Sequence, residues 1–249
     1  MKVKILATGS DGNCVWISNG KVNILVDVGL PARSIEKIML ENDVNPSEVK
    51  AIFVTHEHKD HVSGVGIAKK YLIPVYGSEG TLKKISKLEG AEVMNKQSAI
   101  TFGLGSPEFM TIKRFDVHHD ALEPTGFVIE SAGEKVSVLM DTGKVTPDMI
   151  HAMSYSDIYI FECNHDEDML ANGEYHDSLK ARVLSDSGHL SNKAAAEALS
   201  KLIKGKGEQI YLTHMSSKNN LPALAERIVK RALRQRGYEA GTHYSLVTI

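Results

Sequence analysis

A cluster of metal-binding side chains follows the short apolar run 51–54 and constrains the fold more than any other feature of this sequence. The segment from His56 to His61 is His-Glu-His-Lys-Asp-His, an H-x-H-x-D-H pattern. Residues two apart in an extended segment point to the same side, so His56 and His58 can share one metal ion. The turn that follows sends Asp60 and His61 to a neighbouring position. Imidazole nitrogen and carboxylate oxygen favour zinc, manganese or iron over ions that prefer thiolates.

Further candidate ligands stand at the ends of other predicted strands. In the strand expected at 111–119, the alternation of side chains places His119 on the apolar inner face and His118 on the outer face. Asp141 follows an apolar strand and precedes a tight turn, and His214 closes another strand. Each alone would be an ordinary turn carboxylate or capping histidine. Together they predict a site at the carboxyl ends of the strands, where α/β proteins build their sites.

The rest of the sequence alternates predicted strands and helices. Asn19-Gly20 is a strong hairpin signal between two of the strands. No internal repeat, low-complexity tract or linker divides the chain, so residues 1–249 are expected to form a single α/β domain with mixed sheets. Strands are expected at 2–7, 14–18, 23–28, 51–54, 72–76, 111–119, 125–130, 135–140, 158–161 and 209–212, and helices at 32–40, 65–71, 78–88, 146–153, 192–204 and 222–236.

Charge and cysteine content limit the partners and the compartment. The 29 Lys and Arg against 31 Asp and Glu give a net charge of −2, so any affinity for nucleic acid needs a local basic patch or a metal. Cys14 and Cys163 lie in no metal-binding pattern and are expected to be small buried residues in a reducing cytoplasm. No apolar run has the length of a signal peptide or a membrane span, so no membrane partner is expected.

The order of these residues resembles the metallo-β-lactamase superfamily of metal-dependent hydrolases. The resemblance starts at Asp27 and continues through the H-x-H-x-D-H segment to the candidate ligands near the end of the chain. It implies an αββα sandwich of two mixed β-sheets flanked by helices, with two divalent metal ions at one rim. By this resemblance, one ion is held by His56, His58 and His119, the other by Asp60, His61 and His214, and Asp141 bridges them. Asp27 would orient a ligand imidazole through its other ring nitrogen.

Within the superfamily, the chain resembles the YycJ/WalJ group, which is related to the RNase Z branch. The resemblance rests on the segments 8–13, 161–166 and 184–192, the last of which contains Gly-His-Leu-Ser around His189. It implies 5′-to-3′ exonuclease activity on double-stranded DNA, with a metal-bridging hydroxide as the nucleophile. His189 would act as general acid to the leaving oxygen or would hold the scissile phosphate, and Asp60 and Asp141 would take part in catalysis.

Weaker candidates surround these residues. The residues expected to support the metal ligands are His118, Asn164 and His165. The candidate substrate contacts are Tyr175, Arg182, Ser191 and Asn192. Ser191 or Asn192 is also expected to cap the helix that follows. The last predicted helix has a basic face opposite an apolar stripe, for which a solvated helix face is a commoner explanation than a DNA contact. Its basic residues are Arg227, Lys230, Arg231, Arg234 and Arg236.

Other functions remain open. Hydrolysis of a cyclic nucleotide, as in phage anti-defence proteins of the superfamily, would use the same ligands in a more closed pocket. Thioester hydrolysis of the glyoxalase II type shares the ligands but does not need His189. A non-enzymatic metal- or DNA-binding module would not need the complete ligand set. Asp141 stands where the commonest β-lactamases of the superfamily have a cysteine, which argues against lactam hydrolysis. Access for DNA would be open, or completed by a second copy of the chain in a homo-oligomer.

Overall fold

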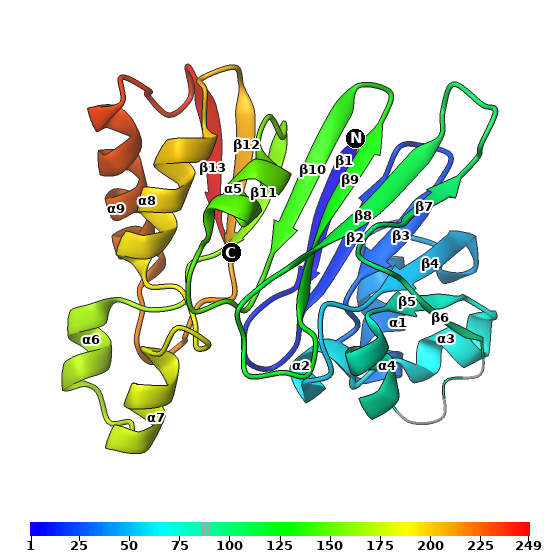
Figure 1. Cartoon of the computed structure of the whole chain (residues 1–249), viewed down its shortest axis with the longest axis horizontal. Helices are drawn as coiled ribbons and strands as arrows, with labels where there is room; N and C mark the ends of the chain where they lie inside the picture. Colours follow the sequence, from blue (N-terminus) through cyan, green and yellow to red (C-terminus); the bar gives the residue numbers. More distant parts are fainter. Residues whose placement is uncertain (86–87, 89) are drawn as a thin grey trace. The chain divides into compact units, whose positions relative to one another are not determined.

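The computed structural model of the protein describes residues 1–85, 88 and 90–249, which form two compact units (Figure 1). Unit 1 comprises Met1–Arg114 and Ala121–Glu134, and unit 2 comprises Phe115–Asp120 and Lys135–Ile249. The single domain expected over 1–249 stays a prediction. No helix within the described ranges combines the length and the apolar character that crossing a membrane requires.

Unit 1 contains the first nine strands, apart from the last two residues of β8. The strands are β1 (Lys2–Ala7), β2 (Cys14–Ser18), β3 (Asn23–Val26), β4 (Val49–Phe53), β5 (Val75–Gly77), β6 (Ala91–Val93), β7 (Ala99–Phe102), β8 (Met110–Asp116) and β9 (Thr125–Ser131). The helices are α1 (Ala32–Glu41), the 3-10 helix η1 (Pro46–Glu48), α2 (Lys59–Val62), α3 (Gly66–Tyr71) and α4 (Glu79–Lys84).

The first sheet of unit 1 has the strand order β1-β2-β3-β4-β5-β6. Its first three strands pair antiparallel, and β3 to β6 pair in parallel. Gly20 takes a φ of 91° in the predicted hairpin turn, a conformation that costs glycine little. Helix α1 buries Ile35 and Met39 in a core that also contains Leu25 and Ile52. This packing covers one side of the strands that lead to the H-x-H-x-D-H segment.

Unit 2 contains a parallel sheet with helices around it. The strands are β10 (Glu134–Leu139), β11 (Ile158–Glu162), β12 (Glu208–Thr213) and β13 (Tyr244–Thr248), and β10, β11, β12 and β13 pair in parallel in that order. The helices are α5 (Pro147–Met153), α6 (Glu167–Asn172), α7 (Asp177–Val183), α8 (Asn192–Leu202) and α9 (Pro222–Gln235). Figure 1 shows α8 and α9 side by side, with α9 next to β13. The carboxyl ends of these strands all lie at one edge, which brings the residues that follow them together.

The strands of the described residues belong to two mixed sheets. Strands β1 to β6 make one of them, and the members of the other are β7, β8 and β9 in unit 1 and β10 to β13 in unit 2. The predicted fold class, two mixed β-sheets flanked by helices, is confirmed. Both cysteines are free and buried, as expected.

The sequence located most of the elements but not all of their ends. The strand predicted at 23–28 ends at Val26, because Asp27 has a φ of 58° that an extended strand does not allow. The strand predicted at 111–119 ends at Asp116. Of the helix predicted at 78–88, α4 covers Glu79–Lys84, and residues 86 and 87 lie outside the described part of the chain. The elements that were not predicted are η1, α2, α6, α7, β6, β7 and β13.

Candidate metal centre

The H-x-H-x-D-H segment of unit 1 leaves the carboxyl end of β4 in extended backbone and then turns into α2. His58 is the N-cap of α2, with φ −64° and ψ 150°, so the predicted change from extended chain to turn falls at this residue. The ring centroid of His56 lies 4.6 Å from that of His58 and 4.1 Å from that of His61. His56 and His61 are buried, and Asp60 is partly exposed. The segment therefore gathers its imidazoles and one carboxylate at a single place.

Asp27, which follows the parallel neighbour β3, organises these side chains. One carboxylate oxygen accepts a hydrogen bond from the backbone N–H of Thr55 at 2.8 Å. The other accepts from the Thr55 hydroxyl at 2.8 Å and lies 2.7 Å from Nδ1 of His61. Because the Thr55 hydroxyl donates its hydrogen bond to Asp27, its oxygen is an acceptor for Nδ1 of His56, which lies 3.1 Å away. Both imidazoles thus carry their proton on Nδ1 and present the lone pair of Nε2.

The donor set of unit 1 fits a metal ion. Nε2 of His61 lies 3.4 Å from Oδ2 of Asp60, so a lone pair faces a carboxylate oxygen, and both are groups that coordinate cations. The Asn13 amide nitrogen lies 3.1 Å from the same Nε2, where its N–H can donate to the lone pair that a cation would otherwise take. A carboxylate that holds Nδ1 of a metal-binding histidine is the common arrangement in metalloproteins.

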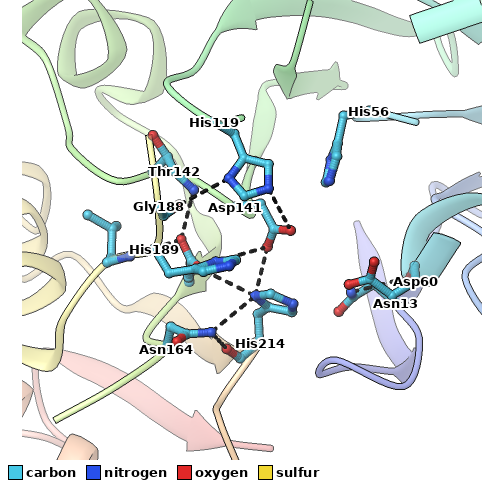
Figure 2. A network of polar contacts seen from close by, with 12 residues as sticks. Asn13, His56, Asp60, His119, Asp141, Thr142, Asn164, Gly188, His189 and His214 are labelled. Atoms are coloured by element: carbon cyan, nitrogen blue, oxygen red, sulfur yellow. Dashed lines mark hydrogen bonds and ion pairs between the residues drawn. The ribbon is translucent and has the colours of Figure 1, made fainter. Parts of the chain in front are cut away.

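In unit 2, the candidate ligands lie just after the ends of strands, two of them after β10 and β12 and one, His119, three residues after the end of β8. Asp141 and His214 follow β10 and β12 and both take left-handed backbone conformations, with φ of 50° and 55°. Such a φ is uncommon outside glycine, and Asp and His are among the residues that tolerate it. His119 is buried and His118 is exposed, so their burial follows the predicted alternation even though β8 ends earlier. Figure 2 shows the polar network around these side chains.

The environment of His119 also fits a cation. Its Nδ1 lies 3.0 Å from the Gly188 carbonyl oxygen, to which it donates, so Nε2 carries the lone pair (Figure 2). That nitrogen lies 3.3 Å from Oδ1 of Asp120 and 3.7 Å from Oδ2 of Asp141. Burial lowers the pKa of His119, although the nearby carboxylates oppose this. The neutral ring therefore directs a lone pair at carboxylate oxygens, an arrangement that a bound metal ion would stabilise.

His214 is held by carboxylates and by an amide. Its Nδ1 lies 2.7 Å from Oδ1 of Asp141 and 3.1 Å from Oε1 of Glu162, which assigns the proton to Nδ1. The Asn164 amide donates to the His214 carbonyl oxygen at 2.9 Å and fixes the backbone at this position (Figure 2). Asn164 thus lies where a residue that supports a ligand is expected.

Glu162 and His189 form a buried pair that the sequence did not reveal. Oε1 of Glu162 lies 2.7 Å from Nδ1 of His189, and Oε2 accepts from the backbone N–H of Thr142 at 2.8 Å and of Leu190 at 3.2 Å. Glu162 has no exposed surface, whereas the His189 side chain is 15% exposed. Ligand-type atoms of Asp141, Glu162, His189 and His214 lie within 4.8 Å of one another. The signal was a glutamate at the end of the otherwise apolar strand β11, between the strands that lead to Asp141 and His214.

The two members of this pair shift each other's protonation. Burial by itself would lower the pKa of His189, but the charge and hydrogen bond of Glu162, with help from Asp141, raise it overall. Burial would likewise raise the pKa of Glu162, but the charge and hydrogen bond of His189 lower it overall. The pair therefore favours an imidazolium beside a carboxylate.

Three further predicted site residues of unit 2, His165, Ser191 and Arg182, differ in burial and in their hydrogen-bond partners. His165 is buried, and burial lowers its pKa. Of the two residues predicted to cap α8, Ser191 and Asn192, the cap is Ser191, whose hydroxyl accepts from the Ala194 N–H at 3.2 Å. Arg182 binds both carboxylate oxygens of Asp120, at 2.5 and 3.1 Å.

Asn192 and Tyr175 differ in how they could meet a substrate. Asn192 is 1% exposed, and its side chain contacts Asn220 at 2.8 Å and the Cys163 thiol at 3.0 Å. A substrate contact by Asn192 would require this buried network to open, so the structure gives it a role in the core instead. Tyr175 is partly exposed, with the Lys218 ammonium 6.0 Å from the centre of its ring.

Comparison with known proteins decides the family. A family model described as "Beta-lactamase superfamily domain" matches residues 22–215, a range that includes every predicted metal ligand. The chain belongs to the beta-lactamase superfamily. Among superfamily members, "Exodeoxyribonuclease YycJ" of Bacillus anthracis is 35% identical over 97% of this chain and 92% of that protein. "Exodeoxyribonuclease WalJ" of Streptococcus pneumoniae serotype 2 is 34% identical over 98% of this chain and 93% of that protein.

A solved structure supports the same fold. The crystal structure of the metallo-β-lactamase fold protein YhfI from Bacillus subtilis matches with a TM-score of 0.74 and 16% identity, over 98% of this chain and 95% of that one. At this identity, the likeness concerns the fold alone. The predicted membership of the superfamily and resemblance to the YycJ/WalJ group are thus confirmed.

Proposed function

We propose that the protein is a metal-dependent phosphodiesterase with two metal ions, acting on DNA as a 5′-to-3′ exonuclease. Membership of the superfamily and the exodeoxyribonuclease names of its relatives support hydrolysis of phosphodiester bonds. The observation that carries the proposal is the buried Glu162–His189 pair, with 2.7 Å between Oε1 and Nδ1. Such a pair suits protonation of an alkoxide leaving group.

The metal ligands are proposed as the sequence predicted them. His56, His58 and His119 would hold one ion, Asp60, His61 and His214 the other, and Asp141 both. The proton positions support this set, because Nδ1 of His56, His61, His119 and His214 each faces an acceptor, Glu162 in the case of His214, and leaves the Nε2 lone pair for a cation. Bound divalent ions would polarise the phosphoryl oxygens and lower the pKa of a nucleophilic water. Zinc, manganese and iron all suit nitrogen and oxygen ligands.

His189 would deliver the proton to the leaving oxygen. Because Nδ1 is held by Glu162, the ring offers Nε2 to the substrate, and the Glu162 carboxylate stabilises the charged imidazolium before the transfer. The backbone donors of Thr142 and Leu190 keep Oε2 of Glu162 in place, so the carboxylate cannot rotate away as the proton moves. Asp27 would keep His61 in its ligating orientation by the same means.

The pair also separates this proposal from thioester hydrolysis. A thiolate leaves readily without a proton, whereas the alkoxide of a nucleotide benefits from a general acid. A cyclic nucleotide has the same kind of leaving group as DNA, so it is kept as a substrate in the experiment. The cytoplasmic location and the association of the chain into a homo-oligomer stay predictions.

The test is a substrate panel on the metal-loaded protein. Duplex DNA labelled at the 5′ or 3′ end, single-stranded DNA, RNA, cyclic mononucleotides and a glutathione thioester are assayed with the wild-type protein, Asp141→Ala and a matched surface control, Asp148→Ala. We expect mononucleotides released from the 5′ end of duplex DNA, lost in Asp141→Ala and kept in Asp148→Ala. Cleavage of cyclic nucleotides or thioester alone would overturn the DNA proposal, and full activity of Asp141→Ala would overturn the proposed metal site.

A further inference from the structure

Helix α9 presents a row of arginines on its exposed side. Arg227, Arg231 and Arg234 are exposed and occur at helical spacing, while Val229 and Leu233 on the opposite side are fully buried. Residues four positions apart on a helix are separated by about 6 Å along its axis, so the guanidinium groups form a row along the helix. The buried side chains account for the packing of α9 against the rest of unit 2, but they do not account for the basic residues on its exposed side.

The basic side chains differ in whether the protein already neutralises them. Arg234 forms an ion pair with Glu239, with an N–O distance of 2.8 Å, and Lys230 pairs with Glu226. Within the part of the chain that the structure describes, no hydrogen bond or ion pair engages the side chains of Arg227, Arg231 and Arg236. Since these three side chains are exposed and form no such interaction, we expect the fold not to depend on their charges.

The surface around these arginines is hollowed. One hollow of about 470 Å³ is lined by Arg227, Lys230, Arg231 and Arg234 together with Ala223 and Glu226. A second of about 480 Å³ lies between α8 and α9, and Arg231 and Arg236 line it together with Lys193. Arg231 lines both hollows and joins them. We call this surface the α9 basic face, defined by Arg227, Lys230, Arg231, Arg234 and Arg236.

Helix α9, which carries the basic face, begins beside the polar network of unit 2. Asn220, just before α9, donates to the carbonyl oxygens of Cys163 at 3.0 Å and of Asn164 at 3.2 Å. Asn164 in turn donates to the backbone of His214. From there α9 extends over 14 residues, or about 21 Å. A ligand that lies along α9 therefore has one end near the residues that follow β11 and β12.

We infer that the α9 basic face binds the phosphate backbone of duplex DNA, and this inference rests on the proposed function. Guanidinium groups without an acidic partner match phosphates, which they bind through pairs of N–H donors. Proteins that hold single strands stack bases on aromatic side chains, but neither hollow has an aromatic residue among its described lining. The face thus suits a duplex held by its backbone, without reading of the base sequence.

The test measures DNA affinity and its dependence on salt. The metal-loaded protein is titrated with a short fluorescent duplex whose terminal linkages are phosphorothioates, which slows cleavage. The variant Arg227→Gln/Arg231→Gln/Arg236→Gln breaks no ion pair among the described residues. We expect the affinity to fall at least about tenfold and the slope of log K against log salt to decrease by about 2 to 3, because each lost phosphate contact removes about 0.9.

Two comparisons make the result specific. A control with the same change in charge in unit 1, Lys21→Gln/Lys37→Gln/Lys50→Gln, should bind as the wild type does, and the triple Arg→Lys variant should recover most of the affinity. All variants should hydrolyse bis(p-nitrophenyl) phosphate at the wild-type rate, because this small substrate does not reach α9. If the proposed function is wrong, the wild type does not hydrolyse DNA, whether or not it hydrolyses this ester. If only the inference is wrong, hydrolysis persists and the arginine variant keeps its duplex affinity and salt slope, or loses affinity for single strands or RNA alone.

Discussion

Oε1 of Glu162 lies 2.7 Å from Nδ1 of His189, in a position where the carboxylate has no contact with solvent. The other oxygen of Glu162 is held by two backbone N–H groups, so the carboxylate has a single orientation. The imidazole is the partly exposed member of the pair. The imidazole is therefore the member of the pair that a substrate could reach, and the carboxylate lies behind it.

The first prediction concerns the leaving group. Glu162→Gln removes the charge that stabilises the His189 imidazolium, and His189→Ala removes the acid itself. Both should lower kcat on DNA by about 10² to 10⁴. On bis(p-nitrophenyl) phosphate, whose leaving group needs no proton, both should keep rates within about tenfold of wild type. An equal loss on both substrates would contradict the role of general acid and would indicate damage to the metal site instead.

The second prediction concerns the orientation of His61 by Asp27. Asp27→Asn keeps the size of the side chain but removes the carboxylate that holds Nδ1 of His61 at 2.7 Å. We expect the affinity for zinc or manganese to fall about 10- to 100-fold, measured by competition with a chromophoric chelator. Asp43→Asn, at an exposed turn position that also has a left-handed backbone (φ 58°), should bind metal as the wild type does. Unchanged metal affinity in Asp27→Asn would show that Asp27 is not needed to orient His61 for metal binding.

The third prediction separates two roles for Arg182. Its guanidinium binds both oxygens of Asp120, and Asp120 Oδ1 lies 3.3 Å from Nε2 of His119. If Arg182 keeps this carboxylate in place at the proposed metal site, Arg182→Ala should lower kcat about tenfold, and the loss should not add to that of Asp120→Ala. Arg182→Lys should recover part of the activity. An increase in KM for DNA that is additive with Asp120→Ala would instead assign Arg182 to the substrate.

The fourth prediction concerns pH and the buried thiols. Burial raises the pKa of Cys14 and Cys163, and the charges of Asp27 and Glu162 raise it further. The folded state keeps both thiols protonated, whereas unfolded thiols ionise above about pH 8.5. Because the folded pKa is raised, the contribution to stability is complete below that pH and is lost as the pH increases. The free energy of unfolding in urea should therefore decrease above pH 8.5 by about 1.4 kcal/mol per pH unit for each thiol.

Two measurements check this interpretation. Cys14→Ala should remove one thiol's share of the pH dependence, whatever its effect on stability at neutral pH. In the folded protein, Ellman's reagent should react with neither thiol at pH 8, and with both after unfolding. Rapid reaction of the folded protein would show that at least one thiolate is accessible.

The sequence predicted the parts of this protein that depend on local pattern. The hairpin at Asn19-Gly20 and the helix cap at Ser191 follow from turn and capping chemistry, and the structure has both. The H-x-H-x-D-H segment also follows a local rule, because its spacing matches extended backbone that ends in a turn. The alternation that distinguished His119 from His118 held for burial even beyond the end of β8.

Glu162 shows what the sequence could not establish. Its role depends on the parallel order of β10, β11 and β12, which brings the ends of strands distant in the sequence to one edge. No local pattern contains that order. Arg182 shows the same limit, since its partner Asp120 lies 62 positions away along the chain. Short elements such as β6 and α6 were missed because they contain too few residues for a periodic pattern.

Asp27, Asp141 and His214 all adopt a left-handed backbone conformation at the end of a strand, with φ between 50° and 58°. A glycine would fit each position with less strain, at a saving of about 1 kcal/mol or more per residue. The fold therefore retains side chains that its own backbone disfavours. In related chains, we expect a glycine at any of these positions to accompany loss of the proposed metal site. Loss of the proposed site in a relative could then be recognised from its sequence at these three positions alone.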